Sequence, residues 1–268
     1  MTNAKAIDDD PGSLHAKAWA EEYELIDRQL SSLGLMAMQE LQLVCGQTVL
    51  DVGCGTGQTL LQLAERVGDK GLVIGVDIAG RLLEVAARRT KELGQVKLIE
   101  ADAQTLDLPP DSVDALFSRF GVMSFDDPVA AFSNFRRLLK PDGRLAFICW
   151  QALQKNELDR FPLVAAGFRS ASNESPFSFA DPTHVQGILA AAGLNDIVMT
   201  PHEELVTSGD VEAMTRVLLK VGPLGKIIRE NPVTHSTVEP KLRKALASLG
   251  DPAKVQLTAS IWVVKARA

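Results

Sequence analysis

A glycine-rich segment near residue 50 constrains the fold of this chain more than any other feature. The apolar residues 48–52 lead into Gly53, Gly55 and Gly57, and residues 58–67 then place apolar side chains at helical spacing. This pattern predicts a buried strand, a tight turn and a helix. The free amides at the start of that helix would face a polar or anionic ligand.

The alternation of strand and helix continues as far as residue 150. Apolar runs predict further strands at 72–76, 96–100, 115–118 and 144–150, with helices at 81–93 and 128–139. Strands that alternate with helices join as parallel neighbours through helical crossovers. The expected fold class is therefore α/β, with a Rossmann-like, mostly parallel sheet and helices on both of its faces.

The sequence on either side of this core predicts mainly helices. Those helices are expected at 13–30, 33–43, 182–192, 211–221 and 238–249, with short strands at 197–200 and 255–265. We expect an N-terminal helical lid at 1–43 and a main domain at 44–268, with small helical cap insertions around 151–180 and 207–250. The phenylalanines of 151–180 favour packing, with an apolar wall for a ligand as the alternative.

An acidic residue follows the glycine turn at the spacing found in nucleotide-binding folds. The second strand ends at Asp77, twenty residues after Gly57, where nucleotide-binding α/β folds place an acid on ribose hydroxyls. Asp51, Asp102 and Ser118 also lie at or just past strand ends, where ligands of such sheets bind. The simpler alternative is that the glycines only shape a turn and that Asp77 caps a helix.

The glycine spacing separates two kinds of cofactor. Dinucleotide-binding folds use G-x-G-x-x-G, whereas this chain has G-x-G-x-G, and position 58 is Gln. An NAD(P)-dependent oxidoreductase with a Tyr-x-x-x-Lys site is disfavoured, because Tyr23 is the single tyrosine and residue 27 is Asp. A non-catalytic protein that binds the cofactor stays open as a further alternative.

The segments VLDVGCGTG, GVDIAGRLLEVAARR, EADAQTLDLPPDSVDALFSRFGV and FRRLLKPDGRLAFICW resemble the motifs of class I S-adenosylmethionine-dependent methyltransferases. The likeness covers about 44–150 and is nearest to the small-molecule branch of ubiquinone and menaquinone C-methyltransferases. It implies a seven-stranded sheet whose last strand, here 255–265, is antiparallel. It also implies S-adenosyl-L-methionine as cofactor, S-adenosyl-L-homocysteine as product, and in-line methyl transfer to a small, lipophilic or aromatic acceptor.

The resemblance also assigns roles to residues of the core. It implies that the methionine end of the cofactor meets Gly53, Cys54, Gly55, Gly57, Ser118 and Arg119. Asp51 would order the turn, Asp77 would bind the ribose hydroxyls and Ile78 would pack on the adenine. Asp102 would reach the adenine amino group, with the backbone of Ala103 beside it.

Residues outside the cofactor motifs are candidates for binding the acceptor. They are Trp19 and Tyr23 on the N-terminal helix, Phe120 and Met123 after the fourth strand, and Trp150 at the end of the fifth. A general base is needed only if the acceptor loses a proton. The candidates for that base are His15, Tyr23 and His202, although histidines more often serve structural roles, and the N-terminal helix can equally pack as a plain amphipathic helix.

Composition limits the partners. The formal net charge is −6, so the clustered Lys and Arg that nucleic acid requires are missing. Three cysteines and four histidines share no ligand-like spacing, and no metal site is expected. The N-terminus lacks the pattern of a signal peptide and no apolar run is long enough to cross a bilayer, so we expect a cytoplasmic protein. Both a monomer and a homodimer stay open.

Overall fold

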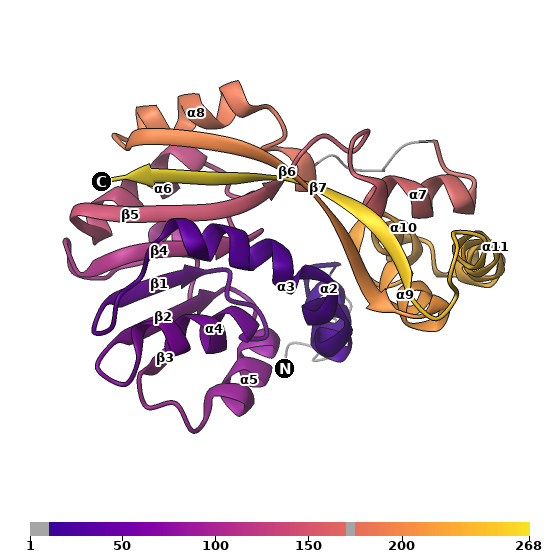
Figure 1. Ribbon diagram of the computed structural model, residues 1–268, viewed down its shortest axis with the longest axis horizontal. Coiled ribbons are helices and arrows are strands. Elements are labelled where there is room, and N and C mark those ends of the chain that lie inside the picture. The colour runs from indigo at the N-terminus through magenta and orange to yellow at the C-terminus, as the bar shows by residue number, and fades with distance from the viewer. Residues whose placement is uncertain (1–10, 170–174) are drawn as a thin grey trace, which may run out of the picture. The chain divides into compact units, whose positions relative to one another are not determined.

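The computed structural model describes residues 11–169 and 175–268 (Figure 1). Within these ranges the chain forms two compact units, the first made of 11–30, 153–169 and 203–260, and the second of 31–152, 175–202 and 261–268. The division falls inside three elements, α3 (Tyr23–Glu40), β6 (Asn195–Gly209) and β7 (Val255–Arg267). The expected boundary of a lid at residue 43 stays a prediction.

A seven-stranded sheet forms the centre of the second unit. Its other strands are β1 (Thr48–Val52), β2 (Leu72–Asp77), β3 (Val96–Glu100), β4 (Val113–Arg119) and β5 (Leu139–Trp150). The strand order is β3-β2-β1-β4-β5-β7-β6. Strands β1 to β5 pair in parallel, whereas β7 runs antiparallel to β5. The predicted fold class, with its antiparallel last strand, is confirmed.

Helices of this unit bury their apolar sides against the sheet and against one another. They are α4 (Gln58–Val67), α5 (Gly80–Thr90), α6 (Pro128–Leu138) and α8 (Pro182–Ala191), with short 3-10 turns at Ala103–Thr105 and Ser175–Phe177. Asp127 caps α6 by accepting a hydrogen bond from the Ala130 amide at 2.9 Å. Phe132, Phe147 and Phe179 lie in the core. Phe179 therefore packs inside the protein, as the first of the two alternatives for the phenylalanine-rich segment expects.

The first unit is mainly helical. Besides the start of α3 it contains α2 (Pro11–Glu21), α7 (Glu157–Ala166), α9 (Val211–Leu218), α10 (Gly222–Glu230), a 3-10 turn at Pro232–Thr234 and α11 (His235–Ala247). α11 packs against α7 and α9, and α10 packs against α2 and α7. Helices in the cap regions were expected, but α7 and α10 were not among them. Pro162 lies inside α7, where a proline argues against a helix in a sequence, whereas Pro223 lies in the first turn of α10, where helices tolerate it.

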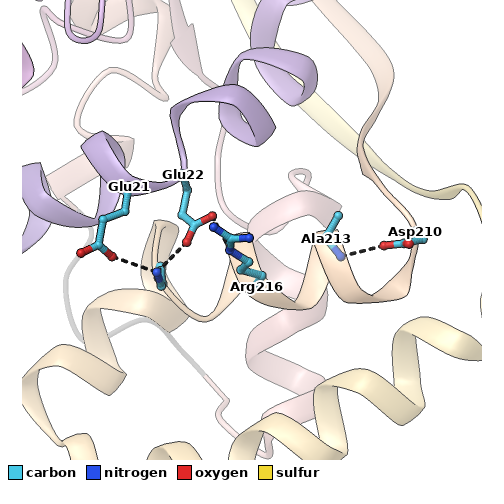
Figure 2. Close-up of polar contacts among 6 residues, drawn as sticks. Glu21, Glu22, Asp210, Ala213 and Arg216 are labelled. Atoms are coloured by element: carbon cyan, nitrogen blue, oxygen red, sulfur yellow. Dashed lines mark hydrogen bonds and ion pairs between the residues drawn. The ribbon is translucent and has the colours of Figure 1, made fainter. Parts of the chain in front are cut away.

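The buried carboxylate of Glu22, at the junction of α2 and α3, forms an ion pair with α9 (Figure 2). The side chain of Glu22 has no exposed surface, and its carboxylate pairs with Arg216 at 2.6 Å and with Lys220 at 2.5 Å. Lys220 also bonds Glu21 at 2.9 Å. The two acids therefore bind two cations that lie one helical turn apart.

Two predicted boundaries are wrong. The sequence predicts one helix to Leu30 and another from Leu33, but α3 runs unbroken through this region and the chain instead breaks at Glu22. Gly34 has a packing role inside α3, because a β-carbon there would lie 3.1 Å from the side chain of Arg119. The strand expected at 197–200 extends over Asn195–Gly209 and passes through Pro201, which an edge strand tolerates.

No helix in the described part of the chain is both long enough and apolar enough to cross a membrane.

Candidate functional site

The turn after β1 lies where the order of the parallel strands reverses. β1 has β2 on one side and β4 on the other, and such a reversal opens a crevice at the carboxyl ends of the strands. Gly53, Gly55 and Gly57 all have positive φ angles, of 70°, 54° and 85°. A β-carbon on Gly55 would meet nothing within 4 Å, so the backbone is open to a ligand at that point.

Asp51 is the last but one residue of β1 and lies just before this turn. Its side chain is fully enclosed, and one carboxyl oxygen accepts a hydrogen bond from the Thr59 hydroxyl in the first turn of α4. The other oxygen, Oδ1, is buried with no hydrogen-bond partner in the described structure. Burial raises the pKa of Asp51 to about 7, against the opposing effects of the Thr59 bond and the charge of Arg119.

Asp77 connects the glycine turn to the next strand. Its Oδ2 accepts a hydrogen bond from the amide of Gly55 and its Oδ1 accepts one from the amide of Ala79, both at 2.9 Å. Burial raises the pKa of Asp77, although these backbone bonds favour its ionised form. The next side chain, Ile78, is 73% exposed, which is unusual for a large aliphatic residue.

Two further predicted residues follow β3. Asp102 is exposed, and its carboxylate accepts a hydrogen bond from the amide of Gln104 at 2.8 Å, which caps the 3-10 turn. Ala103 is buried beside it. Cys54, inside the glycine turn, is also buried, and burial raises the pKa of its thiol, so it stays protonated and unreactive.

The end of β4 is fastened to the glycine turn. Ser118 donates a hydrogen bond to the carbonyl oxygen of Val52 at 2.7 Å, and its hydroxyl accepts one from the amide of Gly121 at 3.1 Å. Arg119 donates a hydrogen bond to the side chain of Gln58 at the start of α4. Side chains therefore join the ends of β1 and β4 on both sides of the turn.

An aromatic pair lies beside this junction. The rings of Phe120 and Trp150 stack with centroids 3.9 Å apart and planes inclined by 18°. Both side chains are half-buried, and Phe120 has a φ of 63°, in the left-handed region. Met123 is also half-buried, and its carbonyl oxygen accepts a hydrogen bond from Ser178 at 2.6 Å. The structure thus brings together two of the predicted acceptor residues, Phe120 and Trp150, at the ends of β4 and β5, while Met123 packs against the core.

Comparisons with known proteins agree with this geometry. A methyltransferase domain profile matches residues 49–143. The demethylmenaquinone methyltransferase of Staphylococcus epidermidis is 30% identical over 180 residues, which are 60% of this chain and 73% of that protein. This chain belongs to the class I S-adenosylmethionine-dependent methyltransferases.

Two further methyltransferases extend the comparison. The 2-phytyl-1,4-naphtoquinone methyltransferase of Thermosynechococcus vestitus is 33% identical over 145 residues, 52% of this chain and 64% of that protein. Phosphoethanolamine N-methyltransferase 2 of Haemonchus contortus, solved with S-adenosyl-L-methionine, aligns with a TM-score of 0.60 at 17% identity. That alignment covers 100% of this chain and 60% of the solved one, and it supports the fold.

The residues present fit the cofactor of a class I methyltransferase. Backbone is open above Gly55, the exposed Ile78 offers an apolar surface for a planar ring, and Asp51 and Asp77 provide carboxylates nearby. Acidic groups suit a cofactor that carries a positively charged sulfur. Family membership also excludes the NAD(P)-dependent oxidoreductase that the sequence left as an alternative.

The remaining candidates lie elsewhere in this methyltransferase. His15, Trp19 and Tyr23 belong to the first compact unit, where the Tyr23 hydroxyl donates a hydrogen bond to Glu24 at 3.1 Å. His202 is half-buried on β6, the edge strand, which two strands separate from β4. Across residues 11–169 and 175–268, no three or more His, Cys, Asp and Glu side chains group as metal ligands would.

Three residues of the methyltransferase site were not predicted from the sequence: Gln58, Thr59 and Gly121. Thr59 could have been found from the rule that a buried carboxylate needs a donor, since it begins the helix after the turn. Gly121 carries a weaker signal, a glycine just after a strand end. Gln58 and Arg119 are distant in sequence, and no local pattern predicts their contact.

Proposed function

We propose that this methyltransferase transfers the methyl group of S-adenosyl-L-methionine to a planar, lipophilic aromatic small molecule. The stacked pair of Phe120 and Trp150 carries the proposal. A half-exposed aromatic face offers an offset stacking surface to another flat ring, and such contacts add about 0.5–1.5 kcal/mol beyond the area they bury.

The position of the pair supports this role. Phe120 follows β4 directly, and the next residue, Gly121, packs against the backbone of Gly53. The amide of Phe120 donates a hydrogen bond to the carbonyl oxygen of Ile148 at 3.2 Å, which fixes the left-handed backbone from which its ring projects. An acceptor stacked on the pair would therefore lie beside the turn to which we assign the methionine end of the cofactor.

The roles we propose for the cofactor residues follow from their chemistry. Asp77 would accept hydrogen bonds from the ribose hydroxyls, Ile78 would cover one face of the adenine, and Asp102 would accept a bond from the adenine amino group. Cys54, Ala103, Ser118 and Arg119 would line the same site, mainly through backbone. When bound, S-adenosyl-L-methionine supplies a methyl group already activated on a sulfonium. The protein therefore mainly orients the two reactants and excludes water.

The names of the relatives favour an aromatic acceptor. One is a demethylmenaquinone methyltransferase and the other a 2-phytyl-1,4-naphtoquinone methyltransferase. Quinone rings are flat and apolar, as the pair of Phe120 and Trp150 requires. We extend to this chain the class of acceptor, a fused or substituted aromatic ring, and not the individual compounds.

The general base depends on the atom that is methylated. A phenolic oxygen or an acidic ring carbon must lose a proton, and His15, Tyr23 and His202 remain the candidates for accepting it. Cytoplasmic location, a homodimer and the lack of a nucleic-acid partner also remain predictions from the sequence.

Methyl transfer to a defined panel tests the proposal. The purified protein is incubated with methyl-labelled cofactor and with a naphthohydroquinone, a catechol or phosphoethanolamine, and products are detected by their added mass. We expect transfer to the aromatic compounds alone. Transfer restricted to phosphoethanolamine, or to none of the three, would contradict it.

A matched pair of variants tests the aromatic surface. Phe120→Leu removes the ring and should raise KM for the aromatic acceptor by about five- to tenfold, the size of one stacking contact. Phe120→Tyr keeps the ring and should stay near the wild type. Affinity for S-adenosyl-L-homocysteine should be unchanged in both variants. Equal KM values for the two variants would show that the Phe120 ring does not contribute to acceptor binding.

A further inference from the structure

Three hydrogen-bond donors gather in the first unit, where α2 packs against α10. His15 and Trp19 lie one turn apart on α2, with ring centroids 5.9 Å apart and planes inclined by 55°. Arg229 of α10 brings its Nη2 to 3.3 Å from Nδ1 of His15. All three side chains belong to the same compact unit.

Arg229 is half-buried, and within the described ranges no carboxylate lies at ion-pair distance from it. Its Nη1 donates a hydrogen bond to the backbone carbonyl of Lys220, which holds the guanidinium in place. Burial lowers the pKa of Arg229, and the charge of the neighbouring Glu230 acts in the opposite direction. A partly buried cation is normally paired with an anion, and among the described residues Arg229 has none.

His15 adds a second donor. A guanidinium can only donate, so Nδ1 of His15 accepts and its proton is on Nε2. Burial, assisted by the charge of Arg229, lowers the pKa of His15 to about 4, which keeps the ring neutral at pH 7. His15 is exposed, so its Nε2–H group can donate to solvent or to a ligand.

Trp19 adds a third donor. Its indole Nε1–H is buried and has no hydrogen-bond partner in the described structure. Buried N–H groups nearly always have a partner, because leaving one unmade costs free energy. The cluster of His15, Trp19 and Arg229 therefore has several donors, one net positive charge and two aromatic rings, but its one acceptor, Nδ1 of His15, is already used by Arg229.

We propose that His15, Trp19 and Arg229 form a binding site for the carboxylate of an aromatic small molecule. The planar guanidinium matches a planar carboxylate, and the two rings provide an apolar surface for the aromatic part of such a ligand. A phosphate fits less well, since it carries more charge and the cluster offers one cation. The proposal goes beyond the methyltransferase function, because the ligand need not be the methyl acceptor.

Calorimetry on the full chain saturated with S-adenosyl-L-homocysteine tests the site. The probes are 2-naphthoate, its neutral counterpart 2-naphthalenemethanol, and inorganic phosphate. We expect 2-naphthoate to bind at least about tenfold more tightly than either comparison compound. Equal affinity for the alcohol, tighter binding of phosphate, or no binding of 2-naphthoate would overturn the proposal.

Variants locate the binding. Arg229→Gln should abolish the binding of 2-naphthoate, and Trp19→Phe, which removes only the indole N–H donor and one ring, should weaken it severalfold. Lys226→Gln removes the same charge from the same helix and should leave it unchanged. Unaltered binding of S-adenosyl-L-homocysteine in all three shows that the cofactor site persists. Wild-type affinity in Arg229→Gln would overturn the proposal.

A spectroscopic signal reports on Trp19 directly and does not depend on the fold of Arg229→Gln. The chain has three tryptophans, and the indole N–H of Trp262 already donates to the carbonyl of Ala180 at 3.0 Å. In the proton NMR spectrum, one indole N–H signal is missing from Trp19→Phe and therefore belongs to Trp19. On addition of 2-naphthoate, this signal should shift downfield as the N–H group gains an acceptor. A shift confined to Trp150 or Trp262 would place the ligand elsewhere and contradict the site.

Discussion

Gly53 and Gly121 touch backbone to backbone, although 68 residues separate them (121 − 53). A β-carbon on Gly53 would lie 2.7 Å from the Cα of Gly121, and one on Gly121 would lie 2.8 Å from the Cα of Gly53. This contact joins the glycine turn to the segment that presents Phe120. The proposed cofactor site and the proposed acceptor surface therefore share one junction.

Gly121→Ala tests that junction. The new methyl group would lie 2.4 Å from the carbonyl oxygen of Val52, so the turn must shift. We expect a loss of about 1–3 kcal/mol in the free energy of unfolding and at least about tenfold weaker binding of S-adenosyl-L-homocysteine, measured by denaturant titration and calorimetry.

Gly187→Ala is the control for this change. Gly187 lies inside α8 with nothing within 4 Å of an added β-carbon, so alanine should stabilise the helix by about 0.5–1 kcal/mol and leave cofactor affinity alone. Equal cofactor affinity in the two glycine variants would show that the junction does not order the turn.

Thr59→Val removes the donor that Asp51 uses while keeping the volume of the side chain. A fully enclosed carboxylate then loses its partner, and we expect about 1–3 kcal/mol less stability together with weaker cofactor binding. Thr59→Ser keeps the hydroxyl and should retain most of both. If valine and serine behaved alike, the hydrogen bond would have no role in the turn.

The pKa of Asp51 predicts a pH dependence of stability. Because the folded state holds the proton up to about pH 7 and the unfolded chain releases it near its ordinary value of 3.8, folding binds a proton between these values. The contribution of Asp51 is fully present below the unfolded pKa and declines until the pH passes the folded value, above which it is constant.

Asp51→Asn abolishes this part of the slope. When both proteins are measured from pH 4 to pH 8, the unfolding free energy of the wild type should fall relative to that of the variant up to about pH 7 and then stay at a constant difference from it. A difference between the two proteins that does not vary with pH would contradict the raised pKa.

Glu22→Gln should loosen the junction of α2 and α3. The substitution leaves Arg216 and Lys220 without the buried carboxylate that they share. Because both cations remain partly exposed to solvent, we expect a cost of about 1–2 kcal/mol in denaturant unfolding, less than for a fully buried pair. Glu24→Gln, at an exposed position two residues on, should lower the free energy of unfolding only slightly. An equal loss in both variants would show that the Glu22 ion pairs do not stabilise the junction.

Local patterns in the sequence predicted the elements around the glycine turn better than the contacts between distant segments. The spacing of Gly53, Gly55, Gly57 and Asp77 is set by one turn, one helix and the strand on each side of them, so a short window contains the information. The contacts of Gly121 with Gly53 and of Arg229 with His15 link distant segments, and nothing in the local sequence marks them.

Boundaries failed where packing or sheet position overrides local preference. The break expected between Leu30 and Leu33 does not occur, because α3 continues through both residues and buries them. Pro201 suggests a strand end, but β6 is an edge strand, and edge strands tolerate a proline.

The most direct test of the account is the affinity of Asp77→Ala for S-adenosyl-L-homocysteine and for NADH, measured by calorimetry. Asp107→Ala, an exposed carboxylate of the same unit, is the control. We predict that the wild type binds S-adenosyl-L-homocysteine and not NADH, that Asp77→Ala weakens this binding by at least about tenfold, and that Asp107→Ala does not. Undiminished affinity in Asp77→Ala, or tighter binding of NADH by the wild type, would contradict it.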